Sequence, residues 1–277
     1  MPQVDRFKKT MAIFEDFTQP LAQRWTETCI GGGSLQIGDS LLRLGFDSAR
    51  QGQYTDAQID DYAGRARSAF PWRPPARMEV RARSTLPGAT PADTGESAGI
   101  LRGTAGFGFW NYPFSIRGDI LMLPEATWFF YASPPSNMAL VPDIPGWGWK
   151  AQVVHSMRPG ALAATVPMAL TATWARLTGE TQRAARWLQR LTGAQEALLN
   201  VEMTAWHTYT LDWRYDEAVF WVDDEIVLRA PDPPTRPLGF VAWLDNQYAV
   251  ATPRGVLRFG TVASGPQWLE IDTIRIE

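Results

Sequence analysis

Two acidic residues and one histidine near the middle of the chain are the side chains best suited to proton transfer. Asp119 and Glu125 lie six residues apart in the segment GDILMLPEATWFF, and His155 ends the segment GWGWKAQVVH. Carboxyl and imidazole groups act as general acids and bases when their surroundings bring their pKa close to neutral pH. Asp119, Glu125 and His155 are therefore the candidate catalytic residues. A zinc site with three histidine ligands is excluded, because the chain has only two histidines.

Aromatic residues are the candidates for ligand binding. The chain contains 13 tryptophans, 13 phenylalanines and 7 tyrosines. Such rings either pack in the core of a β-sandwich or line a surface on which sugars and other flat ligands stack. Trp147 and Trp149 flank Gly148, so both rings can point to one face of a strand. The candidate ligand-binding residues are Trp110, Trp128, Trp147, Trp149 and Trp243, with Asp245 and Asn246 as a polar rim.

The elements that would position these residues are β-strands. Residues 208–213 alternate polar and apolar side chains, which is typical of a strand with one buried face. Residues 218–222 and 225–229 are rich in β-branched and aromatic residues, and Asp223-Asp224 forms a tight turn between them. Three short strands joined by short turns predict an antiparallel meander.

Further strands are predicted along the rest of the chain. They are separated by turn-forming residues and do not alternate with helices, which favours an antiparallel sandwich. Residues 47–75 are polar and end in PWRPP, so we expect a loop there. The other expected strands lie within residues 13–25, 34–46, 76–84, 99–110, 120–123, 127–131, 238–250 and 268–277.

Residues 161–201 differ from the rest of the chain because their apolar residues recur at helical spacing. Trp174 and Leu177 belong to a stripe with steps of three or four residues. The string RLTG occurs twice, and Gly179 and Gly193 would each end or kink a short helix. We predict a helical insertion that either packs on a sheet edge or covers a ligand-binding surface. The insertion would lie within a single domain over residues 1–277.

Composition excludes several classes of protein. Cys29 is the only cysteine, which excludes an internal disulfide and any metal site with several cysteines. A net charge of -3 predicts no broad cationic surface for nucleic acid. No apolar stretch approaches the roughly 18 residues that span a bilayer, and no dinucleotide or phosphate-binding fingerprint occurs. The N-terminus lacks the apolar run of a signal peptide. We expect a cytoplasmic protein that requires no cofactor and binds neither nucleic acid nor a membrane.

Several segments resemble, in the same order, motifs of the concanavalin A-like jelly-roll proteins, and most closely those of the family 16 glycoside hydrolases. The segment WHTYTLDW…FWVDDEIV is similar to the family's F-H-T-Y-x-x-x-W…W-Y-V-D-G-x-x-V meander, with Asp224 where the family often has glycine. ARMEVRARS resembles its R-x-E-V-R-A-R strand, and IFEDF and LEIDTIRIE resemble its first and last strands. The resemblance covers nearly the whole chain outside residues 160–202. It implies an all-β, concanavalin A-like jelly-roll β-sandwich of two antiparallel sheets, one of them concave.

The family's catalytic motif, E-x-D-x-E or E-x-D-x-x-E, is missing. Retaining hydrolysis needs two carboxyl groups about 5–5.5 Å apart. In this chain Asp119 would stand at the nucleophile position, and Leu121 replaces the middle acid. An extended strand would separate the backbones of Asp119 and Glu125 by roughly 20 Å unless Pro124 bends the chain. Standard paired-carboxylate hydrolysis is therefore not expected.

The resemblance also implies a candidate metal site and a structural role for one histidine. Glu15 and Asp272 correspond to the region where relatives hold a structural calcium ion, and oxygen ligands suit calcium. Alternatively, they are two solvated acids. His207 lies in the meander, where the family has a similar histidine as part of the scaffold.

Three functions remain open. The first is a carbohydrate-binding or carbohydrate-active protein related to the family 16 glycoside hydrolases. The second is an enzyme that acts on an apolar small molecule in an aromatic-lined pocket capped by the helical insertion. The third is a non-catalytic interaction domain. The expected partner is accordingly a glycan or an apolar small molecule.

Overall fold

The computed structural model describes residues 12–95, 97–112, 124–138, 140–141, 144–156, 193–251 and 257–277. These residues form strands and one short 3-10 helix, η1 (Arg67–Ala69). The strands are β1 (Ile13–Glu15), β2 (Thr26–Ile30), β3 (Ser34–Gly38), β4 (Leu41–Phe46), β5 (Asp56–Asp60), β6 (Ala76–Ser84), β7 (Thr104–Trp110), β8 (Glu125–Ala132), β9 (Asn137–Met138), β10 (Gly148–His155), β11 (Gln195–Leu198), β12 (His207–Trp213), β13 (Glu217–Val222), β14 (Glu225–Pro231), β15 (Gly239–Asp245), β16 (Gln247–Ala251), β17 (Leu257–Thr261) and β18 (Gln267–Ile276). Within the described ranges, no helix is long and apolar enough to cross a membrane.

The larger sheet, here called the β6 sheet, has eight strands in the order β14-β13-β12-β6-β18-β4-β3, with β1 paired to β18. All its pairings are antiparallel. Strands β12, β13 and β14 form the predicted meander. Asp223 and Asp224 make the turn between β13 and β14 with positive φ angles of 48° and 70°, which aspartate tolerates better than most residues. The Asp223 carboxylate also forms a hydrogen bond with the ring of His207, which supports a structural role for that histidine.

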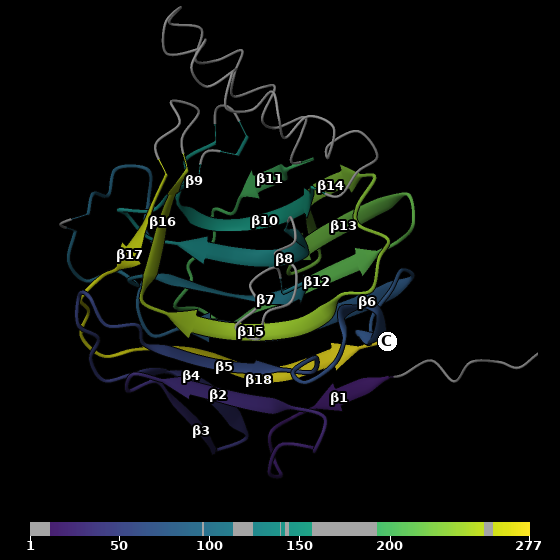
Figure 1. Cartoon of the computed structure of the whole chain (residues 1–277), viewed down its shortest axis with the longest axis horizontal. Coiled ribbons are helices and arrows are strands. Elements are labelled where there is room, and N and C mark those ends of the chain that lie inside the picture. The colour runs from purple at the N-terminus through teal and green to yellow at the C-terminus, as the bar shows by residue number, and fades with distance from the viewer. Residues whose placement is uncertain are drawn as a thin grey trace, which may run out of the picture.

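The second sheet, here called the β8 sheet, has seven antiparallel strands in the order β11-β10-β8-β7-β15-β5-β2. Figure 1 shows its strands bent into shallow arcs over the β6 sheet. A small third sheet has the order β17-β16-β9. Two large antiparallel sheets packed face to face make the predicted jelly-roll sandwich.

Aromatic rings fill the space between the two large sheets. Phe129 of β8 is fully buried, and its ring centroid lies 5.7 Å from that of Phe107 on β7. From the β6 sheet, Tyr209 and Phe220 place their rings 5.1 Å and 5.3 Å from Phe129. These edge-on contacts are the arrangement that aromatic pairs prefer. The alternation seen in the sequence of β12 turns Tyr209, Leu211 and Trp213 into this core.

Residues 47–75 do not form a continuous loop, and this expectation was wrong. They contain β5, whose inward-facing residues Ala57 and Ile59 are fully buried in the core. The strand is only five residues long and carries polar side chains on its other face. A short half-polar strand inside a polar stretch has too little periodicity to stand out.

The predicted helical insertion is only partly covered by the described residues. Residues 161–192 lie outside them, as do residues 120–123. At the far end of the insertion, residues 195–198 form β11 rather than a helix, because they pair with β10 at the edge of the β8 sheet. This corrects the boundary of the insertion. The expected strand over residues 238–250 is divided into β15 and β16 at Asn246.

Candidate functional site

The face of the β8 sheet that points away from the core carries a continuous patch of aromatic rings. Successive residues of a strand point to opposite faces, so Trp128 and Phe130 point outward while Phe129 points into the core. The same alternation turns Trp110 of β7 and Trp243 of β15 outward. We call this patch the outer aromatic face. Its residues are Tyr62, Phe70, Trp110, Tyr112, Trp128, Phe130 and Trp243.

Two glycines of β7 allow the largest rings to lie against the sheet. In the strand register, Gly106 lies opposite Phe130 and Trp243, and Gly108 lies opposite Trp128. A Cβ atom on Gly106 would be 2.9 Å from Cη2 of Trp243, and one on Gly108 would be 2.5 Å from Cβ of Trp128. Both distances are shorter than van der Waals contact. Along the sequence GFGFW, the phenylalanine side chains therefore point into the core, and the glycines place no side chain beneath the outer rings.

Hydrogen bonds fix the planes of two of these indoles. Nε1 of Trp128 donates to Oε1 of Gln152 at 2.6 Å, and Nε1 of Trp243 donates to Oγ1 of Thr104 at 3.0 Å. The Trp128 centroid lies 5.2 Å from that of Trp243 and 5.7 Å from that of Trp110. Trp110 and Trp128 are half-buried, so part of each ring remains accessible. The rings are thus held in place before any ligand binds.

Three aspartates border the outer aromatic face on one side. Asp56 and Asp60 point outward from β5, and Asp245 points outward from β15 directly opposite Asp56. All three are buried. Oδ1 of Asp245 accepts hydrogen bonds from Oγ1 of Thr104 at 2.8 Å and from the backbone N–H of Gln247 at 2.9 Å. Asp245 is therefore joined through Thr104 to the Trp243 indole.

Asp56 and Asp245 hold protons with different strengths. Burial and, to a lesser extent, the neighbouring Asp245 carboxylate raise the pKa of Asp56 to about 8, against a hydrogen bond from Tyr54 that lowers it. Burial also raises the pKa of Asp245, to about 6, and hydrogen bonds from Gln247 and Thr104 oppose that rise. Asp56 is therefore the member of the pair that keeps its proton to the higher pH. A proton donor and a carboxylate lie side by side.

A buried ion pair borders the opposite side of the outer aromatic face. Nζ of Lys150 on β10 pairs with the carboxylate of Glu196 on β11. The second oxygen of Glu196 accepts a hydrogen bond from Nε2 of Gln152 at 3.3 Å, and Gln152 in turn holds the Trp128 indole. Burial raises the pKa of Glu196, and the charge of Lys150 opposes that rise. Polar groups thus flank the rings on both sides.

The structure brings together two of the predicted catalytic residues. Glu125 begins β8 and His155 ends β10, and the two are paired in the strand register. Oε1 of Glu125 lies 3.4 Å from Nε2 of His155, and Nδ1 of His155 lies 3.1 Å from the backbone oxygen of Asp232. Burial raises the pKa of Glu125 to about 7, which suits a shared proton. Asp119, the third predicted catalytic residue, lies outside the described residues.

This carboxyl–imidazole pair lies on the other face of the β8 sheet from the outer aromatic face. Glu125, Thr127 and Phe129 point to the same side of β8, which is the core side, whereas Trp128 points outward. A ligand stacked on Trp128 would be separated from Glu125 by the sheet. Glu125 and His155 therefore lie on the opposite face of the sheet from Trp110, Trp128 and Trp243.

Trp147 and Trp149 share one face, as expected, but it is the core face. Trp149 is buried, with its ring 5.7 Å from that of Phe107. Trp147 packs against the same core, and its Nε1 donates to the backbone oxygen of Thr90 at 2.9 Å. Their positions favour the packing alternative for these two residues and give no support to a ligand-binding role.

The side chain of Asn246 links separate segments of the chain through hydrogen bonds to their backbone. Its Nδ2 donates to the backbone oxygens of Gln53 at 2.9 Å and Val262 at 3.0 Å, and its Oδ1 accepts from the backbone N–H of Thr55 at 2.9 Å. The side chain is fully buried. Since its donor and acceptor groups are engaged within the protein, its position does not support the predicted role in a polar rim.

Glu15 and Asp272, the predicted calcium ligands, each have another partner. Oε2 of Glu15 accepts a hydrogen bond from Nε1 of Trp25 at 3.0 Å, and Asp272 forms an ion pair with Arg81 at 2.9 Å. In the part of the chain that the structure describes, no three acidic, histidine or cysteine side chains form a group suited to a metal ion. A structural calcium ion stays a prediction.

Sequence reasoning missed Asp56, Gln58 and Asp60. The segment DAQID alternates these polar residues with Ala57 and Ile59, which is the signature of a half-buried strand. Its spacing of acid, polar residue and acid is that of the E-x-D-x-E motif, although it occurs on β5 rather than β8. This spacing was the signal that could have identified the acidic border.

The fold defines the class of the protein as an all-β jelly-roll sandwich of two antiparallel sheets, a fold shared with solved carbohydrate-active enzymes. One similar solved structure belongs to the endo-acting O-glycanases that prominent members of the human gut microbiota express to initiate mucin breakdown; its TM-score is 0.53 at 11% identity, covering 95% of this chain and 97% of that one. Another is the Crh5 transglycosylase in complex with NAG, with a TM-score of 0.50 at 13% identity, covering 96% of this chain and 83% of that one. Likeness at such low identity concerns the fold alone. No family model and no curated protein matches the sequence.

Proposed function

We propose that the protein binds glycans on the outer aromatic face. The observation that carries this proposal is the row of indoles on the outward side of a curved sheet: Trp110 and Trp128 are half-buried, and hydrogen bonds fix Trp128 and its neighbour Trp243. Sugar rings have an apolar face that stacks on indoles and hydroxyl groups that need hydrogen-bond partners. Aromatic rings with polar groups at their border meet both needs.

The polar borders favour a glycan over an apolar small molecule. Asp56 and Asp245 lie on one side of the rings, and Lys150 and Glu196 lie on the other. An apolar ligand can add no hydrogen bond to these groups, whereas glycan hydroxyls can donate to the remaining lone pairs of the carboxylates. The apolar-ligand alternative also gains no support from the structures that share the fold, which include a glycanase and a transglycosylase.

A relation to the family 16 glycoside hydrolases belongs to the same proposal. It rests on the motifs of the meander and on the shared fold class. The standard catalytic arrangement has no counterpart on β8, where the outward residues are Ala126, Trp128, Phe130 and Ala132. No carboxyl group of that strand can therefore reach a ligand on the outer aromatic face.

Glycoside hydrolysis by Asp56 and Asp245 is a second candidate function. The two side chains leave neighbouring strands on the same face, at positions whose Cβ atoms in antiparallel pairs are about 4.5–5.5 Å apart. Their pKa values of about 8 and about 6 divide the roles into a proton donor and a carboxylate. This pair meets the chemical requirement that Asp119 and Glu125 do not meet along an extended strand.

Substitution of the central indole tests the binding proposal. We expect Trp128→Ala to weaken binding of laminarihexaose or an N-acetylglucosamine hexamer at least tenfold, because the stacking surface is lost. Isothermal titration and the change in tryptophan fluorescence measure the effect. Trp221→Ala is the matched control, since Trp221 lies on the outward side of the β6 sheet under Arg77. Equal binding by wild type, Trp128→Ala and Trp221→Ala would refute the proposal.

Hydrolysis has a separate test with its own control. If the second function holds, Asp245→Asn abolishes the release of reducing ends from a glycan that wild type cleaves, while binding of that glycan is retained. Glu125→Gln is the control, because Glu125 points to the other face of the sheet. Activity that survives Asp245→Asn and is lost in Glu125→Gln would instead assign catalysis to the Glu125–His155 pair.

A further inference from the structure

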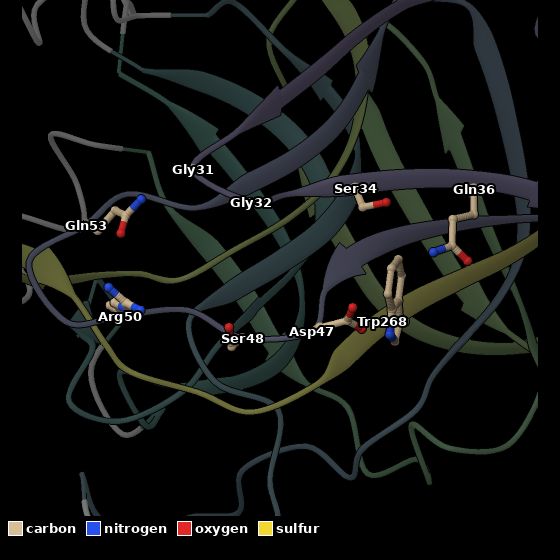
Figure 2. A pocket seen from close by; sticks show the side chains of 9 residues that line it. All are labelled: Gly31, Gly32, Ser34, Gln36, Asp47, Ser48, Arg50, Gln53 and Trp268. Atoms are coloured by element: carbon tan, nitrogen blue, oxygen red, sulfur yellow. The ribbon is translucent and has the colours of Figure 1, made fainter.

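A polar pocket of about 370 Å³ lies near the β3 edge of the β6 sheet, on the outward side of that sheet. It is formed by the turn between β2 and β3, the segment that follows β4, and the start of β18 (Figure 2). The outer aromatic face belongs to the other large sheet and points in the opposite direction. The residues that line the pocket are Gly31, Gly32, Ser34, Gln36, Asp47, Ser48, Arg50, Gln53 and Trp268.

Trp268 gives the pocket a flat apolar wall. Trp268, Gly45 and Ser34 are neighbours across β18, β4 and β3 in the strand register. A Cβ atom on Gly45 would lie 3.0 Å from Cδ2 of Trp268, so the missing side chain is what allows the indole to lie over β4. Gly106 makes room for Trp243 on the other sheet in the same way. Trp268 is half-buried, so part of the ring is left for a ligand.

Hydrogen-bonding side chains surround this indole. Figure 2 shows the carboxyl group of Asp47 on one side of the ring and the amide of Gln36 on the other, with the Ser34 hydroxyl nearby. Within the described residues, the side chains of Ser34, Gln36, Asp47, Ser48, Arg50 and Gln53 form no hydrogen bond or ion pair with the protein. This contrasts with Asp245, Gln152 and Lys150 at the outer aromatic face, whose side chains are all engaged. The donors and acceptors of the pocket are available to a ligand.

The charge of the pocket restricts the class of ligand. Among the residues that line it, Asp47 is the only acid and Arg50 is the only base, so their charges balance. A phosphate or a metal cation would be opposed by one of these two groups. An uncharged polyol with one apolar face fits the combination of an indole, two amides, two hydroxyls and a balanced charge pair. The volume is at the lower end of the roughly 300–1,000 Å³ range of small-molecule sites.

We propose that this pocket is a second saccharide site, in which one neutral pyranose ring stacks on Trp268 and hydrogen-bonds to Gln36 and Asp47. Only the class of ligand rests on the proposed glycan binding; the residues, the sheet and the face are different. The two sites point away from one another, so one short oligosaccharide cannot occupy both. A polysaccharide chain or a glycan-coated surface can engage both, which raises the apparent affinity by multivalency.

The test combines single substitutions in the two sites with a count of bound ligands. The probes are laminarihexaose and an N-acetylglucosamine hexamer, titrated into the protein of residues 1–277 by calorimetry. Wild type is expected to bind two molecules of a recognised probe, and Trp268→Ala one. Gln36→Ala keeps the indole and is expected to weaken the second site severalfold, which guards against a folding defect in Trp268→Ala. Trp221→Ala, on the same sheet, is the control and is expected to retain both sites.

The outcomes separate this inference from the proposed function. Binding that survives Trp128→Ala and disappears in Trp268→Ala supports the second site, even if the outer aromatic face binds nothing. Binding that disappears in Trp128→Ala and keeps its stoichiometry in both Trp268→Ala and Gln36→Ala overturns the second site alone. A wild-type protein that binds neither these probes nor a wider panel of neutral oligosaccharides overturns both proposals.

Discussion

Asp56 and Asp245 show how two residues of one type acquire different chemistry from their neighbours. Both are buried and opposite one another, but only Asp245 has a backbone N–H and a threonine hydroxyl that donate to its carboxylate. Hydrogen bonds to the charged form favour ionisation, and burial disfavours it. Asp56 is left with an unpartnered buried oxygen, and its pKa rises to about 8. The proton in this pair therefore resides on Asp56.

The raised pKa of Asp56 makes the stability of the protein depend on pH. An unfolded aspartate releases its proton near pH 4, whereas native Asp56 keeps it until about pH 8. The native state binds more protons throughout this window. The contribution of Asp56 to the free energy of unfolding is therefore fully present below pH 4. This contribution falls as pH rises toward 8, by up to about 1.4 kcal/mol per pH unit for one proton. The Asp61 and Glu125 carboxyls, with pKa values of about 6 and about 7, act with the same sign.

Urea unfolding between pH 5 and pH 8 measures this slope. Asp56→Asn is expected to make the free energy of unfolding less dependent on pH than in wild type. Asp39→Asn, at an exposed turn, is the control and is expected to keep the wild-type slope. An unchanged slope in Asp56→Asn would show that Asp56 does not keep its proton in the native protein.

Strand β7 shows how one element serves two faces of a sheet. Its core side carries Phe107 and Phe109, and its outward side carries Gly106 and Gly108. Glycine in a strand costs stability because it has no side chain to pack. Here the missing side chains are replaced by the rings of Trp243 and neighbouring residues, which cover the exposed backbone. Strand β7 thus determines how closely the outer rings approach the backbone of the sheet.

We expect Gly106→Ala to impair both stability and glycan binding. The added Cβ would lie 2.3 Å from the backbone oxygen of Phe129 and 2.9 Å from the Trp243 ring, so both must move. Overpacking of this kind costs about 1–3 kcal/mol. Glycan affinity is expected to fall because Trp243 is displaced, and titration with the hexasaccharides measures it.

Gly38→Ala is the matched control for this change, since nothing lies within 4 Å of the added Cβ and the residue is also in a strand. We expect its stability and its affinity to remain close to those of wild type. Equal behaviour of the Gly106 and Gly38 variants would show that the glycines of β7 do not position the rings.

The ring of Phe129 holds the two large sheets together. It contacts Phe107 within the β8 sheet and both Tyr209 and Phe220 across the interface. Its side chain is completely buried. Because each large sheet buries its apolar face only against the other, neither can keep its structure alone.

We therefore expect Phe129→Ala to destabilise the protein by about 3–5 kcal/mol. Far-ultraviolet circular dichroism and tryptophan fluorescence followed in urea should show one coincident transition, shifted to lower urea concentration. Phe259→Ala is the control, because Phe259 is 67% exposed, and a change at such a position is expected to stay within about 0.5 kcal/mol. Two separate transitions would contradict joint stabilisation of the sheets.

Much of the β-sandwich can be predicted from local patterns in the sequence. Strands β6, β12, β13 and β18 and the Asp223-Asp224 turn are predictable because a period of two and a turn residue act over a few neighbouring positions. Trp110, Trp128 and Trp243 could likewise be selected by residue type. Strand β5 was missed because five residues within a polar stretch carry too weak a pattern.

Which of these candidate residues lie close to one another depends on the tertiary structure. It paired Glu125 with His155 across two strands, turned that pair to the face away from Trp128, and placed Asp56 opposite Asp245 although 189 positions of chain separate them. The sequence determines that residues alternate between two faces of a strand. Which face meets the core, and which strand lies alongside, depends on long-range pairing that no local pattern encodes.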